Sequence, residues 1–362
     1  MSHPRPTEDG PLAALLDTTA RCPCGSNEDV TICERHPCNR PPDYFAAPGL
    51  SNSGMSDLAV SPLRYWYNHV RLDREPEEPT PQMAFGTALH CAVLEPDQFE
   101  KRYARELDLA DYPGVLRTME DLRGHLTGMG VKPKGTRKAD VIAQVLEYCP
   151  DYPIWDVLER DHALEHEGKE ILSADFWCRV NRCTEALRLE PALERILSDP
   201  NGHAEQPVFV TDPDINVNLK AKMDWTTPTC TFDVKTFSQK RGKSIDKSVA
   251  DAIWYEQYYR QAWLYSHIRA LVMGGGFGGA QNAPEFVMAF VESDPPHEVR
   301  IKALRPKCGG QVNLYWERAR VECCHLMNLY ADCIREFGEQ PWRTTQDVTP
   351  LYDEDLPGMA FS

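Results

Sequence analysis

The sequence predicts an α/β (α+β) fold with a central mixed sheet flanked by helices, and three observations support this. Helix-like segments fill most of the chain between residue 49 and about residue 198. Three strand-like stretches then follow one another, in AEQPVFVTD, VNLKAKMDW and CTFDVKT. After a further helix come two more strands, in PEFVMAFVES and EVRIKAL, and a long helix over about 306–336. Strands interrupted and framed by helices are typical of a sheet with helices packed on its faces.

The composition bounds the class of protein. With 362 residues, 42% of them hydrophobic, the chain can bury a sizeable core. It has no run of 18 apolar residues and no signal-peptide pattern, so we expect a soluble, cytoplasmic protein without a membrane partner. The formal net charge of −16 argues against a protein that coats nucleic acid with its whole surface.

The two ends of the chain differ in composition from the middle. Residues 1–48 are rich in Pro and Cys and show little periodicity, and residues 341–362 also read as a loosely ordered tail. Residues 49–340 then form the main domain. The N-terminal tail holds a dense group of potential metal ligands, namely Cys22, Cys24, Cys33, His36 and Cys38. Their spacing is not a standard zinc spacing, so a flexible tail is preferred and a Zn2+ site is the alternative.

The segment MAFGTALHCAVLEP, residues 83–96, predicts a helix stopped by Pro96. Phe85, Leu89 and Val93 recur at helical spacing and form one apolar face. His90 lies in the middle of this segment. A lone histidine on a mainly apolar helix is more often a satisfied core residue than a ligand, and from the residues alone both interpretations stay open.

Residues 115–150 read as an insertion made of a helix, a Gly-rich turn and a second helix that begins near Thr136. A miniature apolar core is predicted from Leu122, Leu126, Val131, Val141, Ile142 and Leu146. Basic residues would crowd one edge of it: Arg123, Lys132, Lys134, Arg137 and Lys138. The plain alternative is an ordinary helical hairpin with basic surface residues.

The stretch LKAKMDWTTPTCTFDVKTF, residues 219–237, predicts two strands joined by a turn. Because strand side chains alternate between faces, Asp233 and Lys235 point the same way and Val234 points to the other face. A hairpin would bring Asp224 close to Asp233. Two carboxylates beside an ammonium group suit metal-assisted phosphodiester hydrolysis, whereas the alternative is a surface hairpin with a routine salt bridge.

Basic residues follow this hairpin in KTFSQKRGKSIDK, residues 235–247, with Lys240, Arg241 and Lys243 at its centre. A nucleic-acid enzyme of net negative charge must concentrate its basic residues in a groove, and this run is a candidate. A solvated loop is the alternative.

A helix is predicted over about 249–271. Gln257, Gln261 and Tyr265 are spaced four apart and would share one face of it. Such a polar stripe could bind a phosphate or steady the active strand, and a half-exposed helix face is the alternative. GGGFGG, residues 274–279, lacks the Lys-Ser/Thr of a phosphate-binding loop and reads as a connector.

Several segments, in the same order, resemble the RecE-type exodeoxyribonuclease VIII family within the PD-(D/E)xK, RecB-like nuclease superfamily. The matching segments are GLSNSGMSDLAVSPLRYWY, FGTALHCAVLEP, GHAEQPVFV, KAKMDW with FDVKTF, and QYYRQAWLY. They cover roughly residues 49–112 and 165–335. Separately, GTRKADVIAQVL within residues 115–150 resembles a SAP-type DNA-binding helical hairpin.

The resemblance implies roles for individual residues. His90, Asp224 and Asp233, with the Val234 carbonyl, would bind Mg2+ or Mn2+, and Lys235 would be the catalytic lysine. Glu205 would support a metal ion or a water. Gln261 and Tyr265 would contact the DNA backbone or brace the active strand. Further DNA contacts would come from the two basic segments, through Lys240, Arg241, Lys243, Lys134, Arg137 and Lys138.

The resemblance also implies an activity, namely metal-dependent degradation of one strand of linear double-stranded DNA, in the 5′ to 3′ direction. Relatives of this kind expose single strands for a RecT-like annealing recombinase, in bacterial or phage settings, and some form homo-oligomeric rings around DNA. Two alternatives remain open at this point: a non-catalytic scaffold that binds DNA ends, and a structure-specific endonuclease of the same superfamily.

Overall fold

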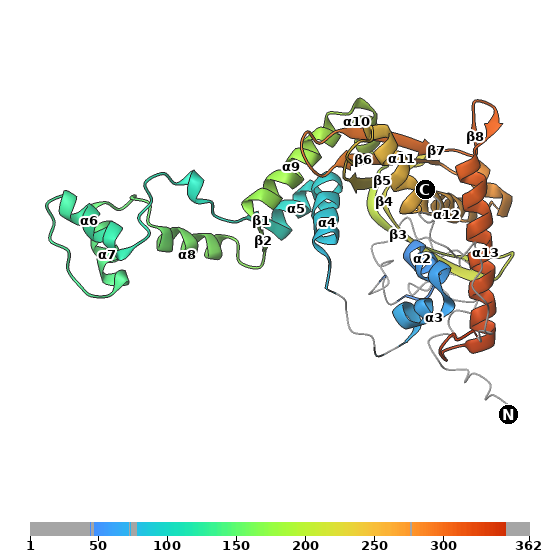
Figure 1. The fold of residues 1–362 in the computed structure, drawn as a ribbon, viewed down its shortest axis with the longest axis horizontal. Helices are drawn as coiled ribbons and strands as arrows, with labels where there is room; N and C mark the ends of the chain where they lie inside the picture. Colours follow the sequence, from blue (N-terminus) through green and yellow to red (C-terminus); the bar gives the residue numbers. More distant parts are fainter. Residues whose placement is uncertain (1–43, 45–46, 72, 74–77, 276, 345–362) are drawn as a thin grey trace.

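The computed structural model describes residues 44, 47–71, 73, 78–275 and 277–344 (Figure 1). The predicted N-terminal tail, with its cysteine-rich group, and nearly all of the C-terminal tail lie outside the described residues. The Zn2+ alternative therefore stays a prediction. Among the residues that are described, no helix has the length and apolar character needed to span a membrane.

A five-stranded mixed sheet forms the centre of the molecule and confirms the predicted fold class. Its strands are β3 (His203–Asp212), β4 (Val217–Thr226), β5 (Cys230–Phe237), β6 (Glu285–Glu292) and β7 (Val299–Leu304), in that spatial order. All neighbours are antiparallel except β5 and β6, which run parallel. A parallel pair needs a crossover connection, and here two helices supply it, α11 (Ile245–Tyr255) and α12 (Tyr258–Val272).

Each face of the sheet has its own hydrophobic core. Leu264 of α12 packs in the core on one face together with α13 (Leu314–Phe337) and α2 (Asn52–Val60). On the other face, α4 (Pro81–Leu94) and α9 (Ala174–Arg188) pack over β5 and β6. Buried strands that are apolar on both faces are expected where helices cover both sides.

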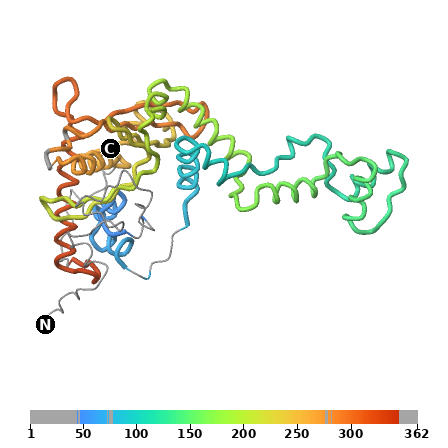
Figure 2. Tube along the Cα trace, turned by 180° about the vertical axis from the view of Figure 1, so that it is seen from behind, coloured from blue at the N-terminus to red at the C-terminus, as the bar shows by residue number. Residues whose placement is uncertain are grey.

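An arm extends from this body (Figures 1 and 2). It contains α6 (Met119–Gly128), α7 (Lys138–Tyr148) and α8 (Trp155–Glu165), and at its base β1 (Tyr103–Arg105) pairs in parallel with β2 (Glu170–Leu172). The arm has a separate core of six buried residues: Leu116, Leu122, Leu126, Val141, Val145 and Ile154. Val145 was not in the predicted set, and the predicted Val131, Ile142 and Leu146 pack around this core half-buried.

The remaining elements are short. They are α3 (Pro62–Tyr65), the π-helical η1 (Trp66–Val70), α5 (Pro96–Arg102), η2 (Leu109–Asp111), α10 (Pro191–Leu197), η3 (Phe277–Asn282), β8 (Lys307–Cys308) and β9 (Gln311–Val312). Pro96 does end α4, as predicted, but it also begins α5, because proline suits the first turn of a helix.

Three helix predictions need correction. The helix expected over 249–271 is two helices, broken at Gln257, which adopts a left-handed conformation with φ 56°. Gln257 therefore does not continue the stripe formed by Gln261 and Tyr265. The helix expected from 306 begins only at Leu314, since β8 and β9 form a hairpin across Gly309 and Gly310, both with positive φ.

The third correction concerns residues 168–198, the last part of the stretch in which helix-like segments were expected. The segment contains β2, then α9, then α10, which begins at Pro191. Ser173 ends the strand and caps α9, because its side chain accepts a hydrogen bond from the backbone N–H of Phe176.

Candidate active site

The central hairpin of the sheet opens where the acidic residues lie. β4 and β5 are paired only near their shared turn, at Trp225–Phe232 and Thr226–Thr231. Asp224 and Asp233 come next in this register. There the backbone N–H of Val234 donates instead to the Asp224 carboxylate, over 3.0 Å. The backbone ladder between the two strands stops at this point, and a carboxylate takes the N–H that a continued ladder would have used.

Asp233 and Lys235 form a buried ion pair on one face of β5, as their alternation predicts. Lys235 Nζ lies 2.7 Å from Asp233 Oδ2, and the two side chains are 16% and 2% exposed. Gln261 of α12 donates to Asp233 Oδ1 over 2.7 Å. Lys235 Nζ also lies 4.9 Å from the centroid of the Tyr258 ring, within the range of a cation–π contact. Val234 points to the opposite face and is fully buried there.

His90 reaches this point from α4. Its Nε2 lies 2.8 Å from the Val234 carbonyl oxygen, and its Nδ1 lies 3.3 Å from Asp224 Oδ2. If Nε2–H donates to the carbonyl, the Nδ1 lone pair faces a carboxylate oxygen. That arrangement favours a proton or a cation between the two atoms. His90 is therefore a functional candidate and not a simple core residue.

Glu205 completes the group through an unusual backbone conformation. It lies opposite Asp224 in the β3–β4 register, but the pairing skips it because its φ is +54°. A left-handed residue that is not glycine is uncommon and carries a conformational cost, so such positions are often functional. The Glu205 carboxylate contacts Lys222 and converges on His90 and Asp224, with one ligand atom from each residue within 4.8 Å of the others.

The electrostatics of the site follow from burial and from the density of carboxylates. Burial raises the pKa of Asp224 to about 6, the nearby Asp233 carboxylate adds to the rise, and His90 opposes it. For Lys235, burial lowers the pKa, but Asp233 and Asp224 outweigh it and the net shift is upward. Lys235 is thus held as an ammonium ion.

The donor set fits a divalent cation. One imidazole and two carboxylates converge, and Mg2+ prefers oxygen ligands while an imidazole also admits Mn2+. Asp233 and Val234 are placed differently from this trio. Both Asp233 oxygens face Gln261 and Lys235, and the Val234 carbonyl contacts His90. Their roles as metal ligands stay predictions.

Comparison with known proteins places the chain in a family. A PDDEXK-like domain of unknown function (DUF3799) matches residues 51–341. The chain belongs to this family. It is also similar to the solved structure of a proposed exonuclease from Eubacterium rectale, with 15% identity, a TM-score of 0.44, and coverage of 79% of this chain and 80% of the other. Similarity at that level adds nothing to the assignment. No curated protein matches the sequence.

Gln261 and Tyr265 brace β5 and β4 of this PDDEXK-like domain. Both are buried, and the Tyr265 hydroxyl donates to the Lys222 carbonyl oxygen over 3.3 Å. Gln261 holds Asp233 and Tyr265 holds β4, so α12 fixes the spacing of the two strands. Of the two predicted roles for these residues, the bracing role is the one that their positions support.

The basic residues after β5 surround one buried carboxylate. Lys243 contacts Asp251 of α11, Lys247 lies 3.4 Å from it, and Lys240 lies 4.0 Å from it. Arg241 is exposed beside them. Asp251 joins the lysines of this loop to α11 and offsets part of their charge.

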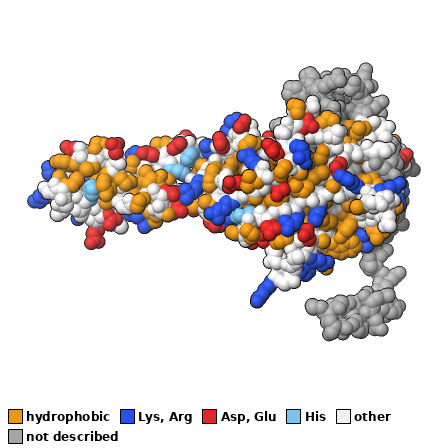
Figure 3. Space-filling view, turned by 90° about the horizontal axis from the view of Figure 1, so that it is seen from above, with side chains coloured by type: hydrophobic (Ala, Val, Ile, Leu, Met, Phe, Trp, Pro, Cys, Tyr) orange, Lys and Arg blue, Asp and Glu red, His pale blue; other side chains and the backbone are white. Residues whose placement is uncertain are grey.

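The basic residues of the arm are exposed or paired near its turn. Arg137 pairs with Asp140 at 2.7 Å, Lys138 pairs with Asp156, and Lys134 is exposed. Figure 3 shows Lys and Arg side chains intermixed with Asp and Glu along the visible face of the arm. In Figure 1, α6 and α7 lie at the outer end of the arm, away from β4 and β5.

Sequence reasoning did not identify three residues that contact the candidate site residues or the basic loop. Lys222 could have been found from the sequence, because it lies two residues before Asp224 on the same strand face. Asp251 could have been found as well, because it lies four residues after Lys247 on a helix. Tyr258 could not, since its position depends on the break between α11 and α12.

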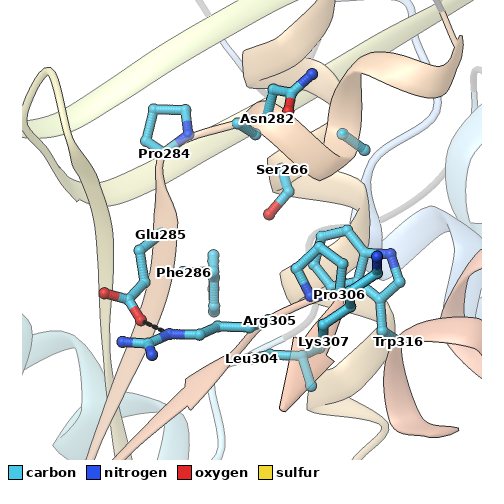
Figure 4. Close-up of a pocket in the computed structure, with 12 residues that line it drawn as sticks. Ser266, Asn282, Pro284, Glu285, Phe286, Leu304, Arg305, Pro306, Lys307 and Trp316 are labelled. Atoms are coloured by element: carbon cyan, nitrogen blue, oxygen red, sulfur yellow. Dashed lines mark hydrogen bonds and ion pairs between the residues drawn. The ribbon is translucent and has the colours of Figure 1, made fainter. Parts of the chain in front are cut away.

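A separate pocket of about 500 Å³ opens between α12, η3, and the β6 and β7 ends (Figure 4). Arg305 and Glu285 form an ion pair at its edge, and Ser266 and Trp316 also line it. It contains none of the residues that converge around Asp224.

Proposed function

We propose that this protein is a metal-dependent deoxyribonuclease that hydrolyses phosphodiester bonds. The observation that carries the proposal is the convergence of His90, Glu205 and Asp224 next to the buried Asp233–Lys235 pair. Membership of a PDDEXK-like family supports it, because this arrangement matches the residue types after which that family is named.

The residues have distinct tasks in the proposed reaction. His90, Glu205 and Asp224 would hold a divalent cation. When bound, the cation supplies Lewis-acid activation of the scissile phosphate and of water. Lys235 donates hydrogen bonds to the attacking water and to a phosphate oxygen, and its positive charge offsets the charge that develops there. Asp233 orients the Lys235 ammonium group, while Gln261 orients Asp233.

The finer proposal is an exonuclease that degrades one strand of linear double-stranded DNA from its ends, 5′ to 3′, with Mg2+ or Mn2+. It would expose single strands for a RecT-like annealing recombinase, in a bacterial or phage setting. The RecE-type resemblance supports these points. A homo-oligomeric ring would place basic segments, such as the loop after β5, in an inner channel and reconcile DNA binding with a net charge of −16.

The arm would contribute affinity to the same activity. Lys134, Arg137 and Lys138 lie at the turn between α6 and α7, where phosphate contacts would hold duplex DNA without reading its sequence. The SAP-type resemblance of this segment supports that role.

The test is digestion of linear duplex DNA labelled separately at each 5′ end, with Mg2+ or EDTA, beside a covalently closed circle. We expect metal-dependent loss of the linear DNA alone, with early release of the 5′ label, and no cleavage by Lys235→Ala. Cleavage of the circle would indicate an endonuclease instead. Firm binding to DNA ends with no cleavage in Mg2+ or Mn2+ would indicate the scaffold.

A further inference from the structure

Two cation–aromatic pairs connect β5 and the segment after it to α12 and α11, one inside the proposed active site and one outside it. In the inner pair, Lys235 of β5 faces Tyr258, the first residue of α12. In the outer pair, Lys240 Nζ lies 5.3 Å from the centroid of the Tyr255 ring, at the end of α11. Lys235 is only 16% exposed, whereas Lys240 is 52% exposed. The second pair is therefore the one nearer to solvent.

The aromatic side chains at and beside the outer pair are unusually exposed to solvent. Tyr255 is 67% exposed and the adjacent Trp254 is 40% exposed. The Arg318 guanidinium group lies 4.7 Å from the centroid of the Trp254 ring. Trp254 also packs against the rings of Tyr259 and Tyr315, so Tyr255 is the more open of the two. An exposed aromatic side chain forgoes the stabilisation that burial would provide, and such exposed patches commonly mark interaction sites.

The charge around these rings is locally positive. Residues 239–255 contain four Lys and Arg residues but only two acids, Asp246 and Asp251, in a chain of net charge −16. Asp246 faces β7, where it lies 3.1 Å from Lys302 and 3.4 Å from Arg300. Asp251 is buried beneath the lysines. Residues 239–255 thus keep an excess of positive charge, although Asp251 pairs with Lys240, Lys243 and Lys247.

We propose that Tyr255 and Trp254, with Lys240, form a stacking platform for unpaired nucleobases of a strand that passes through the active site. Aromatic faces accept any base, and flanking cations contact the phosphates, which is how single strands are held without regard to sequence. The inference deepens the proposed function, on which it rests for the strand that enters or leaves the catalytic centre. The platform would hold that strand just outside the scissile phosphate.

Charge complementarity favours a nucleic acid over a second copy of this chain as the occupant. A second copy would bring 39 Lys and Arg residues along with its 55 acids, whereas a phosphate backbone presents negative charge alone to these lysines. The phosphates of a nucleic-acid strand would pair with the lysines, and its bases would stack on the aromatic rings.

The test compares two fluorescein-labelled single-stranded oligonucleotides of equal length, one of oligothymidylate and one abasic throughout, by anisotropy in EDTA and low salt. We expect Tyr255→Ala to bind oligothymidylate about tenfold more weakly than the wild type, and Tyr255→Phe to restore binding. On the abasic strand, wild type and Tyr255→Ala should bind alike. Lys240→Ala should weaken binding to both strands.

Tyr67→Ala is the matched control, because Tyr67 is 50% exposed and carries a cation, Arg71, over its ring. It should bind both strands as the wild type does. No loss in Tyr255→Ala, or an equal loss on both strands, would overturn the proposal. So would loss of a self-associated state in Tyr255→Ala during sedimentation, which would make the surface a protein interface.

Binding in EDTA needs no catalysis, so the two proposals can fail separately. Base-dependent binding through Tyr255 in a protein that cleaves no DNA would support the platform and contradict the nuclease. Cleavage with unchanged binding by Tyr255→Ala would support the nuclease and contradict the platform.

Discussion

The candidate active site in the sheet and the arm use charged residues in opposite ways. Around β5 the charged groups are few and buried, and each is tied to another, as Asp233 is to Lys235 and Gln261. On the arm they are exposed and paired at most with a neighbour, as Arg137 is with Asp140. Loss of one partner of a buried ion pair strongly lowers the stability of the folded state, whereas an exposed ion pair contributes little to it. Substitutions should therefore change chemistry in the body and affinity in the arm.

The largest effect is expected at Lys235. Lys235→Gln keeps a hydrogen-bond donor but removes the positive charge, so kcat/KM for DNA cleavage should fall by about 10²- to 10³-fold. The single variant should also melt at a lower temperature, because Asp233 is left buried without its cation. Pairing it with Asp233→Asn should restore the melting temperature but not the activity. Recovery of activity in the double variant would show that the pair is structural.

The second prediction compares cores of unequal size. Leu126 is fully buried in the six-residue arm core, and Leu264 is fully buried in the large core beside α12. Truncation of either to Ala should cost about 2–5 kcal/mol in free energy of unfolding. In Leu126→Ala the loss should appear as faster amide exchange confined to the arm, with cleavage of short duplexes unchanged. Leu264→Ala should lower the melting temperature of the body. Global destabilisation by both variants would contradict an independent arm core.

The third prediction concerns pH and Asp224. Its pKa is raised to about 6 by burial and by Asp233, so between about pH 4 and pH 6 the metal-free folded state binds a proton that the unfolded state has released. The metal-free protein should therefore lose stability as pH rises through this window. Bound metal requires the ionised carboxylate, so Mn2+ affinity should fall about tenfold per unit below pH 6. Titration calorimetry at pH 5 and pH 7 measures this, and equal affinities would contradict the assignment of Asp224.

The smallest effect is expected in the arm. The Lys132→Ala and Lys134→Ala double variant removes two exposed cations from the turn between α6 and α7. Duplex affinity should fall a few-fold for every sequence, and the slope of log affinity against log salt should shrink by about 2. Catalysis at saturating DNA should not change. An unchanged salt slope would show that the turn does not contact DNA.

The sequence predicted what depends on local periodicity. Alternation along β5 placed Asp233 and Lys235 on one face and Val234 on the other, and the structure agrees. The five strands and the mixed sheet were also predicted. These features follow from residue spacing of two in strands and from turn residues, which can be read without knowledge of distant contacts.

The rest depends on contacts between distant segments. From the residues alone, His90 could be a core residue or a ligand, because its contact with Val234 lies 144 positions away along the chain. Glu205 depends on a left-handed backbone conformation that no Gly or Asn signals. The break at Gln257 was missed because residues 249–271 contain neither Pro nor Gly. That break re-aims α12 so that Gln261 reaches Asp233, a tertiary requirement that overrides helix propensity.

The central claim is that His90, Glu205 and Asp224 bind one divalent cation beside Lys235. The most direct measurement is Mn2+ binding by titration calorimetry to the wild type and to Glu205→Gln, with Glu120→Gln on the exposed arm as the control. Binding should weaken at least tenfold in Glu205→Gln, stay unchanged in Glu120→Gln, and parallel the loss of DNA cleavage. Unchanged Mn2+ affinity in Glu205→Gln would contradict the claim.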